Sequence, residues 1–249
     1  MFYKVIIKLI IFLKNLLPLN HVTHHKYLNK SQVTNLNVVI NSLKNRGYIP
    51  DNIFDIGCFH GLWSKEISKI FTTSNFFLYD ANDDNDSYLK LLYLENKKFI
   101  YKFKLFSDDQ KDYKFYKMFS GSSIFEEKSL HPRREKNLRS YLLSDEITND
   151  IQKTFNNLIK IDAQGSEIKI LKGLGNYIYN FEVIILEVSV HEYNKNGPLF
   201  DDVMSYMKSK NYILYDIYDL KRLGENNSFL IQFDCIFVRN NSSLLNVKF

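Results

Sequence analysis

The order of apolar segments along the 249-residue chain constrains its fold more than any other feature of the sequence. Short apolar runs typical of buried strands alternate with stretches in which apolar residues recur every three or four positions, as on one face of a helix. We expect strands at 52–57, 75–82, 97–109, 157–165 and 182–190, and helices at 33–46, 62–71, 87–95, 166–174 and 199–211. This alternation predicts a mostly parallel sheet whose strands are joined by right-handed helical crossovers.

The end of the chain and one central segment depart from this alternation. Apolar runs at 212–220 and 229–239 are separated by the turn-like sequence GENNS, which predicts an antiparallel pair. Residues 110–150 contain one strand-like run, YKFYKM, then the small-residue sequence SGSSIFEE and a highly charged stretch. We therefore expect one doubly wound α/β domain at 31–249. Its mostly parallel, seven-stranded sheet should end in an antiparallel hairpin, with a substrate-side insertion at 110–150.

Positive charge is concentrated in an N-terminal arm, residues 1–30. The first 50 residues carry seven Lys or Arg and no acidic residue, so the rest of this chain of net charge +5 carries −2. Such a body lacks the basic face of a nucleic-acid-binding protein. Residues 1–20 place lysines and apolar residues at helical spacing, and their apolar runs are too short to span a bilayer. We keep two alternatives for the arm: a helix packed on protein, or a peripheral helix on the inner face of an anionic membrane.

Acidic residues stand at or just after the end of each of the five predicted parallel strands. They are Asp55, Asp80, Asp108, Asp162 and Glu187. Ligands of open α/β sheets bind outside the carboxyl ends of the strands, so these side chains should face one ligand. Such a rim suits a cationic cofactor rich in hydroxyl groups and would repel a pyrophosphate. The alternative is that each acid only caps the helix that follows its strand.

The sequence FDIGCFHG, residues 54–61, places two glycines after the first predicted strand. Gly57 would let the backbone turn sharply, and Gly61 would let the next helix begin close to a ligand. Asp80, at the end of the second strand, stands where a ribose-binding acid is expected. An amino acid, a positive centre and a ribose are combined in S-adenosylmethionine. The third glycine that a nicotinamide-binding loop needs is absent.

Three stretches of the chain resemble the FkbM-type methyltransferases, which have the Rossmann-like class I methyltransferase fold. They are FDIGCFHG, GSSIFEE, and LIKIDAQGSEIKILKG followed by VIILEVS, and the resemblance runs from about residue 51 to 240. It implies an enzyme that moves a methyl group from S-adenosylmethionine to a hydroxyl of a sugar, a glycan precursor or another small molecule. The chain differs from the common family pattern at Phe59, where Asn is usual, and at Asp80-Ala81, where Glu-Pro is usual.

The expected site residues form two groups. The cofactor-binding residues would be Asp55, Gly57, Gly61, Asp80, Ala81, Ser107, Asp108 and Asp162. The catalytic candidates are Asp162 and Glu187, because a hydroxyl acceptor benefits from a nearby base, with His191 as an alternative base. Structural roles stay open for all three: Asp162 could order the AQGSE turn, Glu187 could be a hydrogen-bonded structural acid, and His191 could be a surface residue.

Other ligands and functions have less support in the sequence. No His-rich or Asp-x-Asp spacing indicates a metal site, so we expect none. Cys58 and Cys235 are too few for a disulfide framework, which favours a reducing, cytoplasmic location. A basic group in the insertion, which could bind an anionic acceptor or be solvated, comprises His131, Arg133, Arg134 and Arg139. Two rival functions remain, a nicotinamide-dependent oxidoreductase and a non-catalytic interaction module.

Overall fold

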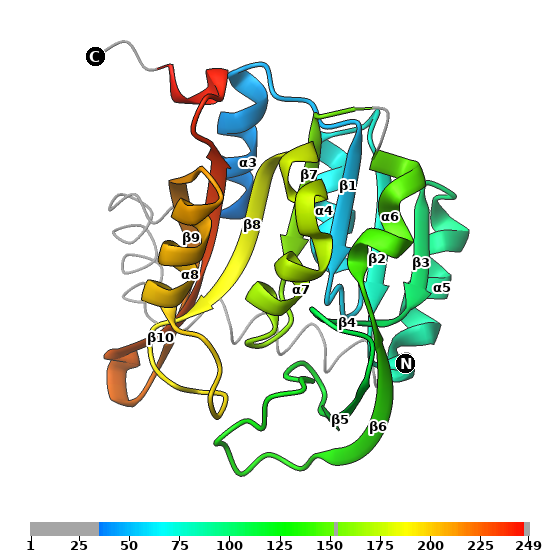
Figure 1. Ribbon diagram of the computed structural model, residues 1–249, viewed down its shortest axis with the longest axis vertical. Coiled ribbons are helices and arrows are strands. Elements are labelled where there is room, and N and C mark those ends of the chain that lie inside the picture. The colour runs from blue at the N-terminus through cyan, green and yellow to red at the C-terminus, as the bar shows by residue number, and fades with distance from the viewer. Residues whose placement is uncertain (1–34, 152–153, 247–249) are drawn as a thin grey trace, which may run out of the picture. The chain divides into compact units, whose positions relative to one another are not determined.

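The computed structural model describes residues 35–151 and 154–246, which form a sheet between two layers of helices (Figure 1). The seven strands lie in the order β3-β2-β1-β7-β8-β10-β9. They are β1 (Asn52–Ile56), β2 (Asn75–Asp80), β3 (Phe99–Phe103), β7 (Asn157–Ile161), β8 (Phe181–Ser189), β9 (Tyr212–Leu223) and β10 (Phe229–Arg239). The first five in this spatial order are parallel, whereas β10 is antiparallel to both β8 and β9. The predicted doubly wound sheet with its terminal hairpin is confirmed.

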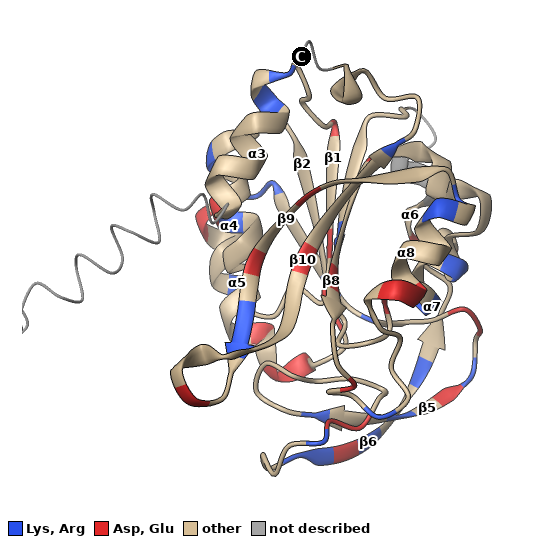
Figure 2. Cartoon of the chain, turned by 90° about the vertical axis from the view of Figure 1, so that its left-hand side faces the viewer, with Lys and Arg blue, Asp and Glu red and all other residues tan. Residues whose placement is uncertain are grey.

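In the described part of the chain, helices cover both faces of the sheet, as Figure 1 and Figure 2 show from two directions. One face carries α3 (Leu36–Asn45), α4 (Leu62–Ile70) and α5 (Asp86–Glu95), and the other carries α6 (Leu143–Ile151), α7 (Glu167–Leu174) and α8 (Phe200–Ser209). Each helix lays an apolar stripe on the sheet, as Val39, Ile40 and Leu43 do from α3. Because both faces are covered, β1 and β7 are buried at every position. This explains why such strands read as continuous apolar runs.

A row of three asparagines fixes the register of the central strands at their N-terminal ends. Asn52 of β1 is the register partner of both Asn75 in β2 and Asn157 in β7. The Asn52 Nδ2 atom donates to Asn157 Oδ1 at 2.9 Å, and Asn75 Nδ2 donates to Asn52 Oδ1 at 3.1 Å. Asn52 and Asn157 are buried, and buried amide groups must find hydrogen-bond partners. A shift of β1 by one residue would break the hydrogen bond between the two buried amides, so the row disfavours such a shift.

A second, smaller sheet interrupts the alternation between β3 and α6. Its strands, in spatial order, are β4 (Leu105–Phe106), β6 (Arg134–Tyr141) and β5 (Asp112–Lys117). The single strand expected at 97–109 is therefore divided at Lys104, where the chain passes from β3 to β4. The charged stretch of the insertion also contains β6, which we did not predict. Most of its side chains are exposed, so its polar sequence lacks the usual apolar alternation.

Two expectations concern membranes. In residues 35–151 and 154–246, no helix combines the length and apolar character needed to cross a bilayer. The expectations for the arm at 1–30, including contact of residues 1–20 with a membrane surface, lie outside the described residues.

Candidate active site

The loop after β1 brings the ends of two neighbouring strands together. Gly57 has a φ of +77°, in the left-handed region that glycine adopts without strain. A Cβ atom at this position would lie 1.8 Å from the backbone carbonyl oxygen of Asp162, just after β7. The amides of Gly57 and Cys58 both donate to the carbonyl oxygen of Tyr79 in β2, at 2.8 and 3.0 Å. The sharp turn expected here is thus held against both adjacent strands.

The second glycine of this loop has a different role from the expected one. Gly61 has a φ of +72°, and a Cβ atom there would lie 2.6 Å from a methyl carbon of Leu92. Methyl carbons of Leu78 and Leu89 would be 3.2 Å away. These leucines belong to β2 and α5. The glycine therefore lets α4 begin against the apolar core, and Gly61 does not line the cavity described below.

Asp80 ends β2 with a carboxylate that holds the β1–α4 loop in place. Its Oδ2 atom accepts the backbone N–H of Phe59 at 2.7 Å, and its Oδ1 atom accepts that of Asn82 at 2.7 Å. Burial raises the pKa of Asp80 to about 6, although both N–H groups favour the charged form. Phe59 has a φ of +49°, which is unusual for a bulky residue. The hydrogen bond to Asp80 helps to hold it there.

A cavity of about 670 Å³ lies at the carboxyl ends of the central strands. Gly57, Asp80 and Asp162 line it from the main sheet, and residues 118–124 line it from the insertion. Further polar lining residues are Asn82, Glu127, Gln164, Tyr193, Lys221 and Gln232. None of these six was proposed from the sequence. Glu127 and Gln164 stand in GSSIFEE and KIDAQGSE, which carried the resemblance. Lys221 and Gln232 lie on the terminal hairpin, where no local pattern marks them.

The eight expected cofactor-binding residues divide into two sets in space. Those that line the cavity are Gly57, Asp80, Ala81 and Asp162, and those that do not are Asp55, Gly61, Ser107 and Asp108. Asp55 is fully buried, and its Oδ2 atom accepts the Ser64 hydroxyl at 2.6 Å. Asp108 pairs with Lys169 at 3.0 Å and accepts the Ser107 hydroxyl at 3.1 Å. Both carboxylates are bound by other side chains of the protein, and neither lines the cavity.

Asp162 is held by a buried lysine. Lys160, 4% exposed, donates to Asp162 Oδ2 at 2.9 Å, and Gln164 Nε2 donates to Oδ1 at 3.2 Å. Burial alone would raise the pKa of Asp162, but Lys160 and Lys221 lower it to about 2. Burial disfavours the charge of Lys160, yet the carboxylates of Asp162, Asp55 and Asp234 raise its pKa. Asp162 is therefore an ionised carboxylate and a weak base.

Glu187 is surrounded by three donors. Lys221 forms an ion pair with its Oε1 atom, and Gln164 and Gln232 donate to Oε2 at 2.6 and 3.2 Å. Burial and the nearby Asp162 raise the pKa of Glu187. Glu187 does not line the cavity, but all three donors do. The structure thus places Glu187 behind the cavity wall, where it orients side chains that face a ligand.

His191, the third catalytic candidate, lies away from the cavity. Its ring stacks on Phe229 of β10, with ring centroids 4.3 Å apart, and its side chain is exposed. It is not among the residues that line the cavity. This placement matches the surface role that the sequence left open.

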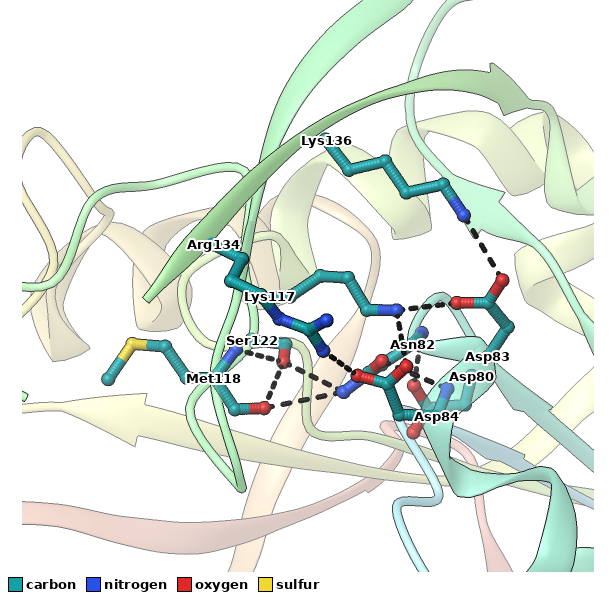
Figure 3. A network of polar contacts seen from close by, with 9 residues as sticks. All are labelled: Asp80, Asn82, Asp83, Asp84, Lys117, Met118, Ser122, Arg134 and Lys136. Atoms are coloured by element: carbon teal, nitrogen blue, oxygen red, sulfur yellow. Dashed lines mark hydrogen bonds and ion pairs between the residues drawn. The ribbon is translucent and has the colours of Figure 1, made fainter. Parts of the chain in front are cut away.

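A network of charges fastens the insertion to the loop that follows β2 (Figure 3). Lys117 of β5 donates to Asp83 at 2.6 Å and to Asp84 at 2.9 Å. Arg134 and Lys136 of β6 add contacts to Asp84 at 2.5 Å and to Asp83 at 3.1 Å. The same short segment donates the Asn82 amide to Met118 O at 3.3 Å. These contacts set the insertion beside Asp80, where it forms a wall of the cavity.

The basic group expected to meet an anionic acceptor is dispersed. Arg133 donates to the backbone carbonyl oxygens of Glu127 and Ser129, and Arg134 belongs to the charge network. Arg139 is exposed on β6. His131 is the member of the group that lines the cavity. The expected basic cluster is therefore not formed.

A family model described as the methyltransferase FkbM domain matches residues 55–214. The chain belongs to the FkbM methyltransferase family. The match begins at Asp55 in β1 and ends within β9, so it includes the ends of β1, β2 and β7 beside the cavity. Family membership confirms the resemblance seen in the sequence.

Solved structures match this FkbM methyltransferase at low sequence identity. FkbM from Methylobacillus flagellatus KT is 14% identical with a TM-score of 0.46, and the match covers 76% of this chain and 43% of that one. Fibrillarin from Methanococcus jannaschii is 10% identical with a TM-score of 0.48, covering 77% and 68%. M. capricolum TrmK, solved with S-adenosyl-homocysteine, is 12% identical with a TM-score of 0.46, covering 84% and 70%. The chain thus spans less than half of the Methylobacillus protein. Among curated proteins there is no match.

S-adenosylmethionine is the cofactor of this methyltransferase, as the sequence predicted. The residues present fit it. Each Asp80 oxygen accepts one backbone N–H, and the Asn85 side chain also bonds to this carboxylate, so one oxygen keeps a lone pair for a ribose hydroxyl. Asp162 supplies a negative charge for the cationic part of the cofactor. Gly57 keeps the wall between the two free of a side chain. In the described ranges, no three His, Cys, Asp or Glu side chains are grouped as a metal site needs.

Cofactor affinity is expected to fall as the pH drops below about 6, the pKa of Asp80. A ribose hydroxyl donates best to an ionised carboxylate, so protonation of Asp80 weakens the complex. If the cofactor binds only the ionised form of Asp80, its affinity should fall roughly tenfold for each pH unit below that pKa. Calorimetry with S-adenosylhomocysteine from pH 5 to 8 measures it. Asp80→Asn should bind about 5- to 150-fold more weakly, the range of about 1–3 kcal/mol, with a flat profile. A flat profile in the unmodified protein would contradict the assignment.

Proposed function

We propose that this FkbM methyltransferase transfers a methyl group to a hydroxyl of a small molecule, with a sugar or glycan precursor as the acceptor. The observation that supports it most is the shared cavity. One half is formed by Gly57, Asp80 and Asp162 at the strand ends, and the other by the insertion and Tyr193. A cavity of about 670 Å³ has room for more than one ligand of small size.

The lining of the second half suits a polyhydroxylated acceptor. Aromatic groups are available from Phe119 and Tyr193, and amide groups from Gln164 and Gln232. Flat rings pack against the C–H face of a sugar. The amide oxygens can accept from its hydroxyl groups, whereas the amide nitrogens already donate to Asp162 and Glu187. Phe119 is 76% exposed, so this half opens to solvent beside the insertion. The expected group of His131, Arg133, Arg134 and Arg139 is not gathered at this half, which favours a neutral sugar over a phosphorylated one.

The residues have distinct parts in this reaction. S-adenosylmethionine supplies a methyl group activated by the positive charge of its sulfur. Asp80 orients the cofactor, and Asp162 balances its charge; because Asp162 is a weak base, it is not well suited to take a proton. Glu187 orients Gln164 and Lys221 behind the acceptor. Alignment of the reacting groups by these contacts supplies much of the rate.

Methyl transfer from radiolabelled S-adenosylmethionine to saccharide fractions of cell-surface glycans tests the proposal. We expect label in at least one fraction, and we expect it to resist mild alkali, because an ether is stable where a methyl ester is hydrolysed. Label released by alkali would indicate a carboxylate acceptor. If a protein that binds S-adenosylhomocysteine labels no fraction, the proposed acceptor class is wrong. The non-catalytic interaction module would then be favoured if other acceptors also fail.

A further inference from the structure

The loop that joins β5 to β6, residues 118–133, is held against the acceptor side of the cavity. The Ser123 hydroxyl donates to the backbone oxygen of Gln164 at 2.8 Å, and Glu127 forms an isolated bridge with Asn194. The amide of Lys128 donates to the carbonyl oxygen of Tyr193 at 2.9 Å. These bonds tie the loop to the segments that follow β7 and β8. Glu127 is therefore placed by backbone contacts on both sides.

Three carboxylates line the cavity, and in two of them both oxygens already accept hydrogen bonds from the protein. Both oxygens of Asp80 accept backbone N–H groups, and both oxygens of Asp162 accept side-chain donors. Glu127 differs from them. Its Oε1 atom accepts the Tyr193 hydroxyl at 2.8 Å, while in the described part of the chain no hydrogen bond is found for Oε2. Glu127 is only 3% exposed, so its open oxygen is reached through the cavity.

The space around that oxygen depends on a glycine. A Cβ atom on Gly121 would lie 2.6 Å from Glu127 Oε2, closer than a real contact allows. Gly121 also lines the cavity. Any larger residue there would push the carboxylate aside. The sequence GSSIFEE thus supplies both the carboxylate and the space that it occupies.

We propose that Glu127 accepts the proton of the acceptor hydroxyl during methyl transfer. This rests on the proposed function and names a base that the sequence did not. The hydroxyl proton passes to Glu127 Oε2 while the hydroxyl oxygen forms its bond to the methyl carbon. The bond from that carbon to sulfur breaks and leaves its electron pair on the sulfur. Tyr193 acts as a positioning residue, because its hydroxyl donates to the other oxygen of the same carboxylate.

Three single substitutions separate catalysis from structure. Glu127→Gln keeps an oxygen for Tyr193 but removes the base. We expect kcat for the labelled saccharide fraction to fall about 100- to 10,000-fold, with KM within about threefold. Tyr193→Phe removes the hydrogen bond but keeps the base, and should cost less than about tenfold. The matched control is Glu126→Gln, because Glu126 forms ion pairs with Lys195 and Arg133 and does not line the cavity. It should stay within about threefold of the unmodified enzyme.

Two readouts do not require turnover. Sinefungin, a cofactor analogue, should bind Glu127→Gln with unchanged affinity by calorimetry, because Glu127 belongs to the acceptor half. Carbodiimide coupling of glycine methyl ester, mapped by peptide mass spectrometry, should modify Glu127 and spare Asp162 and Glu187, whose oxygens are occupied.

Several results would overturn the proposal. A loss of kcat below tenfold in Glu127→Gln would refute the base, and an equal loss in Tyr193→Phe would assign Glu127 a structural role. A tenfold loss of sinefungin affinity in Glu127→Gln would place Glu127 in the cofactor half of the cavity. If the unmodified enzyme methylates no saccharide, the proposed acceptor class is wrong, and carbodiimide modification then tests Glu127 independently. The absence of Glu127 from the modified peptides would overturn the proposal.

Discussion

Gly57→Ala is expected to lower the free energy of unfolding by more than about 4 kcal/mol, the range reserved for severe steric or core defects. The new Cβ atom would lie 1.8 Å from the Asp162 carbonyl oxygen, and a backbone atom cannot rotate away. The alanine must also adopt the left-handed conformation of Gly57, which costs roughly 1–2 kcal/mol. Urea unfolding followed by circular dichroism measures the loss. The ends of β1 and β7 would have to separate, so cofactor binding should also be lost.

A matched control separates the collision from the backbone strain. Gly47, just after α3, also has a positive φ, +89°, and a Cβ atom there would meet nothing within 4 Å. Gly47→Ala should therefore cost only the conformational energy, roughly 1–2 kcal/mol. Equal losses in the two variants would show that the contact between Gly57 and Asp162 is not limiting.

Lys160→Met is expected to lower the free energy of unfolding by about 3–5 kcal/mol, as for other buried ion pairs that lose one partner. Lys160 is buried, lies 2.9 Å from Asp162, and faces Asp55 and Asp234 as well. Methionine fills a similar volume but leaves these carboxylates without a compensating charge. In the variant, the pKa values of these carboxylates in the native state should rise above their values in the unfolded chain. Its stability should therefore fall as the pH rises from 5 to 8, and urea unfolding at both values tests this.

An exposed lysine provides the comparison for Lys160. Lys65 pairs with Glu95 at 2.5 Å across α4 and α5, and both side chains are about half exposed. Lys65→Met should cost less than about 1 kcal/mol and show little pH dependence. If Lys160→Met behaved in the same way, the carboxylates around it would be neutral or hydrated in the native protein. The low pKa of Asp162 would then need another explanation.

The fold could be predicted because its determinants are local. Apolar runs and helical periods located the main strands and α3, and the GENNS turn placed the hairpin. The strand β6 could not be recognised, because its pairing with β5 depends on residues about twenty positions away and its own side chains are mostly exposed. Nothing in a charged, polar stretch distinguishes an exposed strand from a loop. The segment forms a strand because it pairs with β5.

The sequence could predict only those site residues that stand at the carboxyl ends of the strands. Asp80 and Asp162 stand at the rim and line the cavity, whereas Asp55 lies within β1 and is covered by α4. The difference of one or two positions along a strand decides which face a side chain meets, and sequence patterns locate strand ends less finely than that. Lys221 and Glu127 reach the cavity from distant segments, so only the folded chain brings them there.

The asparagine row at the opposite end of the sheet has a consequence for engineering. With β1, β2 and β7 aligned at Asn52, a residue inserted inside β1 would displace its cofactor end by about 3.3 Å and reverse which face its side chains meet. The loop at 118–133 carries no such alignment, since it leaves and re-enters the separate β5–β6 pair. If the loop contacts the acceptor as proposed, substitutions in it that keep Gly121 and Glu127 should change acceptor preference, while the strands on the cofactor side keep their alignment.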